Sequence, residues 1–357
     1  MEDTKYLFDD TITPEGMISV SQIQTYLSCK KKWEYGYIEE ITPRVERSFL
    51  MIGKLCHKGM QTAMQALWYL SGSGVTMDEL RETAIASMET DYNQYMREVP
   101  LLDEEIPDME QMWEDAKSVF TQALEEFEPL KYEVVSVVKD GAKVPALELH
   151  FCVPCTGTRG LHGFIDAILK EKETGHIWCV DYKFRKTLAP DEDEAFNIQN
   201  SVYSYACMKM GIPITGTMTW QHVNTPAAEP QVLKDGKMSR SKIKTTWSAY
   251  RKACIRAGID PADYEEEMVS KLSEIEWFRA TREYRNVETI VTIWNTCVAP
   301  VSMAIAESRK PGANNYRSLY PWNCKMCQFQ SLCQAELRGY DANAIRLREY
   351  TKRSHAR

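Results

Sequence analysis

Apolar and polar positions alternate in the middle of the chain in a way that predicts β-strands. Residues 164–169 and 177–182 are rich in β-branched and aromatic side chains, and the charged segment between them ends in glycine. This pattern predicts two strands joined by a turn, that is, a β-hairpin. Three further strands are predicted in the same way, at 132–138, at 146–153 after a turn at Asp140-Gly141, and at 214–223.

Apolar residues spaced three to four positions apart predict helices on both sides of these strands. Ser19 or Ser21 caps the first helix, which runs to about Gly36, and a second helix begins near Phe49. The remaining helices are predicted at 77–97, 107–128, 191–210, 241–258, 261–277 and 287–307, with irregular segments at 1–18 and 225–245. Four strands, a helix and a fifth strand in this order predict an α/β (α+β) fold, in which helices pack on a central mixed sheet.

Length and composition limit the class of protein. A chain of 357 residues has room for one large domain or two smaller ones. No uninterrupted run of about 18 apolar residues is present and the first residues are polar, so we expect a soluble, cytoplasmic protein without a membrane partner. Eleven cysteines in such a protein indicate reduced thiols or a metal site rather than disulfides.

The charge balance bears on nucleic-acid binding. The net charge of −8 disfavours nonspecific attraction to nucleic acid. Three segments are nevertheless locally basic, at 183–186, 234–252 and 279–285. Any binding to nucleic acid is therefore expected to be local.

The predicted hairpin carries an unusual set of charges. Asp166 lies on the first strand and Asp181 on the second, with Lys183 two residues further on. Side chains alternate along a strand, so Asp181 and Lys183 share a face, and Asp166 can reach it. Two carboxylates and an ammonium are costly to bury unless they pair with one another or hold a metal ion. The hairpin therefore predicts either an ion pair at the strand end or a metal site.

Three cysteines near the C-terminus have the spacing of metal ligands. Cys324, Cys327 and Cys333 form the pattern Cys-x2-Cys-x5-Cys. The first pair can bind one centre from a tight turn, and the third cysteine can return to it from the next element. Zinc and an iron–sulfur cluster both fit this spacing, and either would require a fourth ligand from elsewhere in the chain.

Other candidates carry little information alone. His57 lies four residues after Gly53 on one helix face, and taken alone it reads as a packed or surface histidine. Gly53 is a poor helix former, which predicts close approach of another backbone. Gln199 and Tyr203, also four apart, are compatible with an ordinary amphipathic helix.

In their order along the chain, these motifs resemble those of the PD-(D/E)XK nuclease superfamily. More narrowly, they are similar to the RecB-like branch that carries an iron–sulfur cluster, which includes AddB-type recombination nucleases and CRISPR-adaptation exonucleases. The motifs are Gly53-x3-His57, Glu148, Gly163-Phe164-Ile165-Asp166, Asp181-x-Lys183 and Gln199-x3-Tyr203. The resemblance covers the N-terminal helices, residues 132–223 and the C-terminal cysteines, but not 77–128 or 225–310. Ile165 departs from the proline of the superfamily name, as it does in many RecB-like members.

The resemblance implies a restriction-endonuclease-like core and a role for each matching residue. Asp166, Asp181 and His57 would bind Mg²⁺ or Mn²⁺, and Lys183 would position or activate the attacking water and stabilise charge on the phosphate. Gln199 and Tyr203 would contact DNA and support Lys183, and Glu148 would be a less regular acid of the site. Arg185, in the basic run 183–186, is a further candidate for contact with DNA. Four cysteines would hold a 4Fe-4S cluster that joins the N-terminal helix to the C-terminus: Cys29, Cys324, Cys327 and Cys333.

The expected organisation is one integrated nuclease domain with four parts. They are an N-terminal helical region (1–130) that contributes Cys29 and His57, a nuclease core (131–223), a helical insertion (224–310) and an iron–sulfur region (311–357).

The expected function is a metal-dependent deoxyribonuclease that acts as an exonuclease in DNA recombination, repair or phage DNA metabolism. Carboxylate ligands suit Mg²⁺ or Mn²⁺, and the histidine shifts the preference toward Mn²⁺. Burial could lower the pKa of Lys183 and so suit it to orienting water. The alternatives are an end-trimming or endonucleolytic subunit of a larger complex, as in CRISPR adaptation, and an inactive DNA-binding scaffold.

Expected partners follow from one missing motif. The pattern Gly-x4-Gly-Lys-Ser/Thr of helicases is absent. Unwinding would therefore come from a partner such as a helicase, a single-strand-binding protein or a recombination protein, in a bacterial or phage-infected cell.

Overall fold

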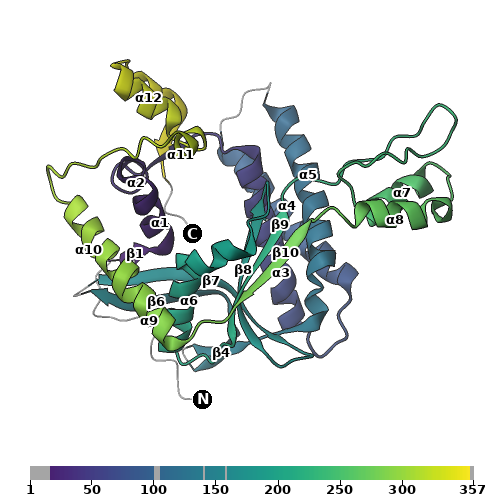
Figure 1. Cartoon of the computed structure of the whole chain (residues 1–357), viewed down its shortest axis with the longest axis horizontal. Coiled ribbons are helices and arrows are strands. Elements are labelled where there is room, and N and C mark those ends of the chain that lie inside the picture. Colours follow the sequence, from purple (N-terminus) through teal and green to yellow (C-terminus); the bar gives the residue numbers. More distant parts are fainter. Residues whose placement is uncertain (1–16, 100–104, 140, 157–158, 354–357) are drawn as a thin grey trace.

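The long strand β7 (Arg159–Glu171) organises a seven-stranded mixed sheet (Figure 1). The structure is a computed structural model that describes residues 17–99, 105–139, 141–156 and 159–353. The sheet order is β1-β7-β8-β9-β10, and β3 and β6 also pair with β7. The other strands of this sheet are β1 (Met17–Ser19), β3 (Tyr132–Val134), β6 (Leu147–Thr156), β8 (Ile177–Arg185), β9 (Gly216–Val223) and β10 (Phe278–Glu283). The β1–β7 and β8–β9 pairs are parallel and the rest antiparallel, which confirms the predicted central mixed sheet.

The predicted hairpin is formed by β7 and β8, and its two strands separate where the acids lie. Their ladder runs from Lys170–Ile177 to Ala167–Val180. Beyond that pair, β7 continues against β6, while β8 continues in parallel with β9 as far as Arg185. Asp166 and Asp181 are the first residues past the end of the shared ladder, so their backbones are free to form other contacts.

Three long helices cover one face of the sheet. They are α3 (Ser48–Tyr69), α4 (Met77–Glu98) and α5 (Ile106–Phe127). Met60, Met88 and Phe120 are fully buried between them, in one core that extends to the sheet at Trp178 and Val180. The predicted helical region between the N-terminal helices and the first strands is confirmed.

The opposite face is covered by α1 (Val20–Ser28), α6 (Ile198–Lys209) and a long helix over residues 287–308 (Figure 1). Ser19 caps α1 by accepting a hydrogen bond from the backbone N–H of Gln22. The long helix consists of α9 (Val287–Ile293), a π-helical turn (Trp294–Val298) and α10 (Ala299–Ser308).

The helix over 287–308 bears on the expected absence of a membrane partner. By length and composition alone it could cross a membrane, because it has 22 residues and a mean hydropathy of 1.5 in its most apolar window. In the fold, 28% of that window is buried. Its inner side chains, including Trp294, Val298 and Ile305, belong to the core beneath the sheet. Core helices of soluble proteins pass the same test, so this helix is weak evidence for a membrane span.

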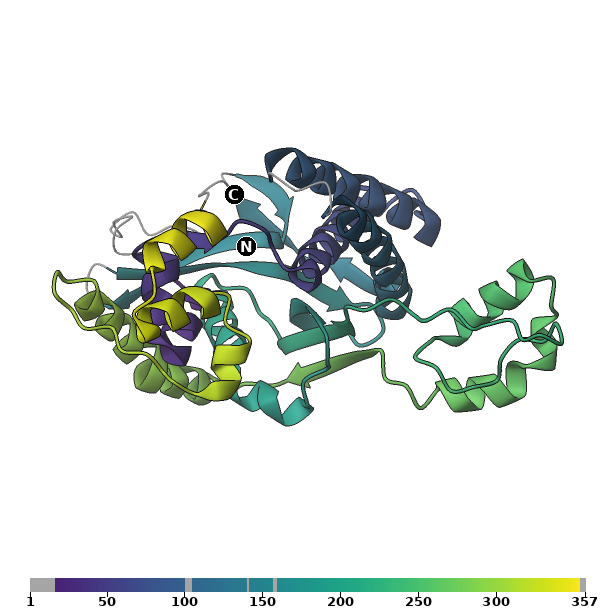
Figure 2. The ribbon, with the colours of Figure 1, turned by 90° about the horizontal axis from the view of Figure 1, so that it is seen from above.

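The C-terminal segment packs against the N-terminal helix α2 (Figures 1 and 2). It consists of α11 (Pro321–Lys325), α12 (Gln330–Arg338), α13 (Ala342–Glu349) and β11 (Tyr350–Lys352), beside α2 (Lys30–Tyr37) and β2 (Ile41–Pro43). Strand β11 pairs antiparallel with β2. Tyr35, Phe329 and Leu332 are buried in a small separate core, so the two ends of the described chain are held together by apolar packing.

Several element boundaries differ from the sequence predictions. The predicted strand at 132–138 is divided into β3 and β4 (Ser136–Lys139), and β4 forms a hairpin with β5 (Ala142–Pro145). The predicted helix over 191–210 begins as a 3-10 helix (Asp191–Phe196), and a further 3-10 turn precedes β3 (Pro129–Lys131). The irregular arm predicted at 1–18 lies largely outside the described residues, but Met17 and Ile18 belong to β1.

The sequence prediction missed strand β10. A helix was expected over 261–277, but α8 (Glu265–Leu272) ends early and the chain then enters β10 at Phe278. Alternating Phe278 and Ala280 do carry a strand signal, but the segment is rich in arginine and short. Pairing with β9 supplies the stabilisation that the local sequence lacks.

Residues 224–277, between β9 and β10, leave the body as an arm (Figures 1 and 2). The arm contains α7 (Trp247–Arg256), a 3-10 turn (Pro261–Asp263) and α8. It has its own small core, which includes Met238, Tyr250, Cys254 and Met268.

Two glycines of α3 allow a matched test of packing. A Cβ at Gly59 would lie 2.6 Å from the ring of Phe120 and 2.7 Å from Sδ of Met88, whereas one at Gly53 would lie 3.7 Å from the carbonyl oxygen of Phe184. We expect Gly59→Ala to destabilise the protein by about 1–3 kcal/mol through overpacking. Gly53→Ala should stabilise it by about 0.5–1 kcal/mol, because alanine is the better helix former. Urea unfolding of both variants checks this, and equal effects would contradict the packing argument.

Candidate active site

The candidate site lies where β7 and β8 separate. Asp166 on β7 is 8% exposed, and its Oδ2 accepts a hydrogen bond from the backbone N–H of Tyr182 at 2.9 Å. The same oxygen lies 2.8 Å from Nε2 of His57 on α3. The end of the shared ladder thus frees a backbone donor of β8, and the carboxylate of β7 uses it.

His57 connects two carboxylates. Its Nδ1 lies 3.5 Å from Oε1 of Glu148 on β6, opposite the nitrogen that faces Asp166. One ligand atom from each of His57, Glu148 and Asp166 lies within 4.8 Å of the others, so this group could hold a metal ion. Glu148 has a φ of 45°, which is uncommon and costly for a residue other than glycine. Backbone strain thus coincides with a charged side chain of the site.

Asp181 forms a second, adjoining group. It is 1% exposed, and its Oδ1 accepts hydrogen bonds from Nζ of Lys183 at 2.7 Å and from Nε2 of Gln199 at 3.0 Å. Gln199 accepts from Lys183 through Oε1 at 3.3 Å and donates to the hydroxyl of Tyr203 at 2.7 Å. Oδ2 of Asp181 is buried and has no hydrogen-bond partner among the described residues. An orphaned carboxylate oxygen of this kind fits a metal ligand.

The charges of the site shift one another's protonation. Burial raises the pKa of Asp181 to about 6, and the neighbouring charge of Asp166 adds to the effect. Burial also acts to raise the pKa of Asp166, but His57 and Lys183 outweigh it, so the pKa lies below its ordinary value. Burial acts to lower the pKa of His57, but Asp166, Glu148 and Asp181 raise it above its ordinary value.

Lys183 differs from the expectation. Burial alone would lower the pKa of Lys183, as the sequence analysis anticipated. The charges of Asp181 and Asp166 outweigh burial and raise that pKa. Without a bound cation, Lys183 is therefore an ammonium that can donate hydrogen bonds and balance negative charge.

The structure brings together most of the predicted site residues. Asp181 is not a member of the group formed by His57, Glu148 and Asp166. Gln199 supports both Asp181 and Lys183, whereas Tyr203 is 5% exposed and supports Gln199 from inside the fold. A direct contact of the Tyr203 side chain with DNA is therefore disfavoured. Arg185 is partly exposed two positions beyond Lys183 on β8.

Sequence reasoning missed the network that fixes the start of α6. The carboxylate of Glu194 is 2% exposed and accepts hydrogen bonds from Asn200 and Thr219, both at 2.7 Å, and from Asn197 at 2.8 Å. This network ties the first turn of α6 to β9 and so places Gln199 beside Asp181. Asn197 could have been recognised as a helix cap, but no sequence pattern links Glu194 to Thr219.

Of the four predicted cysteine ligands, Cys29, Cys327 and Cys333 lie near one another at the joined ends of the chain. The one metal-sized group among the described residues contains none of these cysteines. Cys29 lies at the break between α1 and α2, and its Sγ accepts the backbone N–H of Ser318 at 3.4 Å. Cys333 on α12 accepts from Nε of Arg317 at 3.3 Å. Burial raises the pKa of Cys327, and the nearby thiols of Cys29 and Cys333 add to this effect. Sulfurs that accept N–H hydrogen bonds, in a set of soft donors, fit ligation of a metal cluster.

Comparison with models of known protein families gives a match over most of the chain. The model of the PD-(D/E)XK nuclease superfamily matches residues 17–334. The match spans every candidate site residue and also runs through 77–128 and 225–310, to which the motif resemblance did not extend. A search of curated proteins found no match.

The pKa shifts predict how pH affects metal binding. A bound cation has to displace the proton of His57, whose pKa is raised, and below about pH 6 that of Asp181 as well. We expect the affinity for Mn²⁺ to decrease as the pH is lowered, by about tenfold per pH unit for each proton that the cation displaces. Titration calorimetry without DNA, from about pH 5 to 8, measures this. The variant His57→Gln should retain only the dependence below about pH 6, and a pH-independent affinity would contradict the assignment.

Proposed function

The chain belongs to the PD-(D/E)XK nuclease superfamily, and we propose that it is a Mg²⁺- or Mn²⁺-dependent deoxyribonuclease of the RecB-like branch. We propose further that it acts as an exonuclease on DNA ends or single strands, in recombination, repair or phage DNA metabolism. The central mixed sheet flanked by helices is consistent with the restriction-endonuclease-like fold of this superfamily. The observation that carries the proposal is the convergence of a metal-sized group with Asp181 and Lys183 where β7 and β8 separate.

Hydrolysis of a phosphodiester requires a water to attack phosphorus while the bond to the leaving oxygen breaks. A divalent cation bound by Asp166, His57 and Asp181, with Glu148 beside them, would polarise the phosphate and acidify the attacking water. Superfamily members use divalent metals, and the orphaned oxygen of Asp181 fits such a ligand.

The chain's own residues supply orientation and charge. Lys183 is an ammonium held between Asp181 and Gln199, with its side chain 27% exposed. From there it can donate hydrogen bonds to a phosphate oxygen, where negative charge develops in the transition state. Gln199 keeps Lys183 in place, so we propose it as a positioning residue.

Replacement of Asp181 tests the proposed chemistry. We expect Asp181→Ala to retain DNA binding but to lose at least about a hundredfold in cleavage rate, because a ligand and the partner of Lys183 are removed together. The exposed Glu192→Ala, on the 3-10 turn, is the control and should cut at the wild-type rate. Persistent cutting by Asp181→Ala with Mg²⁺ or Mn²⁺ would contradict the assignment.

The choice of substrate in the same assay separates the competing functions. Linear single and double strands that are degraded from their ends, with circles left intact, indicate an exonuclease. Cut circles indicate the endonucleolytic alternative, such as an end-trimming subunit of a larger complex. Binding without cutting by the wild-type protein indicates an inactive scaffold.

We propose that Cys29, Cys324, Cys327 and Cys333 hold a 4Fe-4S cluster with a structural role. Its support is the approach of the α1–α2 break to the C-terminal helices, with sulfurs hydrogen-bonded to N–H groups. The cluster would join the two ends of the chain beside the small core of Tyr35 and Phe329. Zinc is the rival occupant. All eleven cysteines are free, which fits the reducing cytoplasm of a bacterial or phage-infected cell.

Replacement of one cysteine tests the cluster. We expect Cys324→Ser to lose iron and to lower the free energy of unfolding, because loss of a structural metal releases the joined ends. Cys297→Ser, partly exposed on the long helix, is the control and should keep both. Iron, sulfide and zinc are quantified on anaerobic preparations. Zinc in place of iron would contradict the cluster, and iron loss with unchanged stability would contradict its structural role.

A further inference from the structure

The arm of residues 224–277 has a hydrophobic core of its own. Its core consists of side chains no more than 4% exposed, including Met238, Tyr250, Tyr264 and Met268. The hydroxyl of Tyr264 accepts the backbone N–H of Met238, and the hydroxyl of Tyr250 donates to the carbonyl of Ser239. These contacts lie within the arm, and its exposed side chains are not part of this core.

Charge on the arm is divided along the sequence. Residues 230–256 carry eight basic side chains and one acid, whereas 257–277 carry seven acids and one lysine. Three of the basic side chains pair with acids of the arm, in Arg240–Glu267, Lys242–Glu274 and Arg256–Glu229. Lys244 lies over the ring of Trp277.

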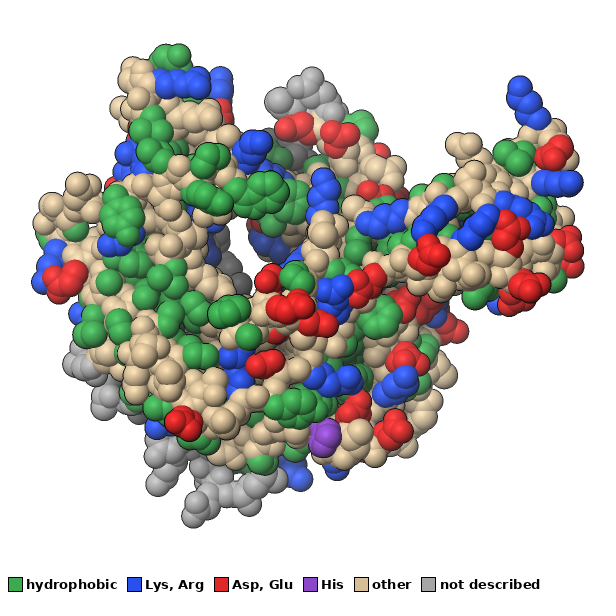
Figure 3. Space-filling view, viewed as in Figure 1, with side chains coloured by type: hydrophobic (Ala, Val, Ile, Leu, Met, Phe, Trp, Pro, Cys, Tyr) green, Lys and Arg blue, Asp and Glu red, His purple; other side chains and the backbone are tan. Residues whose placement is uncertain are grey.

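Four basic side chains of the arm are exposed and form no ion pair among the described residues. They are Lys234, Lys237, Arg251 and Lys252. Figure 3 shows Lys and Arg side chains in a row along the arm on the face in view, with a few acids among them. Unpaired cations gathered on a projecting element suit a polyanion.

The arm begins where the strand of the active site ends. Arg185, the last residue of β8, pairs with Val223 of β9, and the next backbone N–H, of Asn224, donates to the carbonyl of Arg185 at 2.8 Å. Asn224 also donates from its side chain to the carbonyl of Phe49 on α3 at 3.1 Å. The basic run 183–186 therefore leads from Lys183 in the site to the root of the arm.

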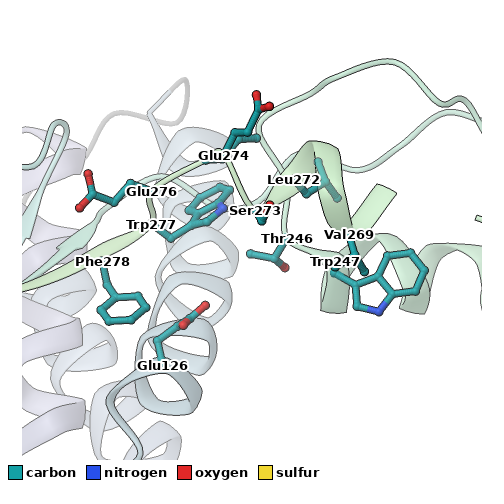
Figure 4. Close-up of a pocket in the computed structure, with 11 residues that line it drawn as sticks. Glu126, Thr246, Trp247, Val269, Leu272, Ser273, Glu274, Glu276, Trp277 and Phe278 are labelled. Carbon is teal, nitrogen blue, oxygen red and sulfur yellow. The ribbon is translucent and has the colours of Figure 1, made fainter. Parts of the chain in front are cut away.

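A pocket at the root of the arm does not fit the same partner. It has a volume of about 420 Å³ and lies between the arm, β10 and α5 (Figure 4). Trp247, Trp277 and Phe278 line it together with acids of the arm root and Glu126, whose pKa is raised by burial. Acidic lining repels phosphate, so binding of a polyanion is assigned to the basic residues and not to this pocket.

We propose that the arm binds the phosphate backbone of DNA outside the active centre, through Lys234, Lys237, Arg251 and Lys252. This inference rests on the proposed nuclease function and adds the element that holds the substrate during cleavage. Phosphate contacts of this kind are independent of sequence and release counterions, so they raise affinity and make it depend on salt. The arm contributes to binding and leaves the chemical step to the body.

The test neutralises these four side chains together. The variant Lys234→Gln/Lys237→Gln/Arg251→Gln/Lys252→Gln is made in the Asp181→Ala background, and its affinity for labelled linear DNA is measured over a range of salt concentrations. We expect the slope of log K against log [salt] to decrease in magnitude by about three, since each lost phosphate contact removes about 0.7–0.9. The control Glu265→Gln/Glu266→Gln removes exposed acids of the same arm and should keep at least the wild-type affinity.

Cleavage by the otherwise intact enzyme separates binding from chemistry. With Asp181 restored, the fourfold variant should show a raised KM and an unchanged kcat at saturating DNA. If the variant cuts DNA with an unchanged salt slope and an unchanged KM, the role of the arm is overturned while the nuclease function stands. The basic residues of the arm would then fit an acidic protein partner instead. Failure of the wild-type protein to cut and of Asp181→Ala to bind DNA would overturn both the proposed function and the arm's role.

Discussion

The separation of β7 and β8 is the constraint on which the site depends. Strand β7 pairs with β8 only up to Ala167 and then continues against β6, because β8 turns to pair in parallel with β9. Asp166 and Asp181 stand at this point, and the freed N–H of Tyr182 becomes the partner of Asp166. A uniform hairpin would keep this N–H in its own ladder and would leave less room for side chains from both helical layers.

Buried charge at this point is tolerated because each helical layer contributes a partner. His57 on α3 reaches Asp166 from one face of the sheet, and Gln199 on α6 reaches Asp181 from the other. Two features of the site remain unfavourable. Oδ2 of Asp181 is buried without a hydrogen-bond partner among the described residues, and the backbone of Glu148 has a positive φ. Buried polar atoms without partners and local backbone strain are common at functional sites, where a bound ligand can supply the missing interaction.

The periphery of the molecule complements this centre in two ways. The C-terminal helices pack on α2 and bring the Cys327 region to Cys29, so segments about 300 residues apart are held together. The arm extends from the other side, where β9 meets β10, and carries its own core and charges. The C-terminal packing joins segments distant in sequence, whereas the core of the arm is formed within residues 224–277. The family match covers both regions, because it runs from residue 17 to 334.

The sequence alone determined the mixed sheet with its helices, the hairpin, the superfamily and the candidate site residues. These follow from the alternation of apolar residues, from helical spacing and from the order of motifs, all of which can be read along the chain. Only the tertiary structure decided what depends on distance. It placed Glu148 beside His57, buried Tyr203 behind Gln199, connected Glu194 to β9, and formed β10 by pairing it with β9. It also reversed the expected pKa shift of Lys183, because that shift depends on how close two carboxylates lie, and no pattern in the sequence records such a distance.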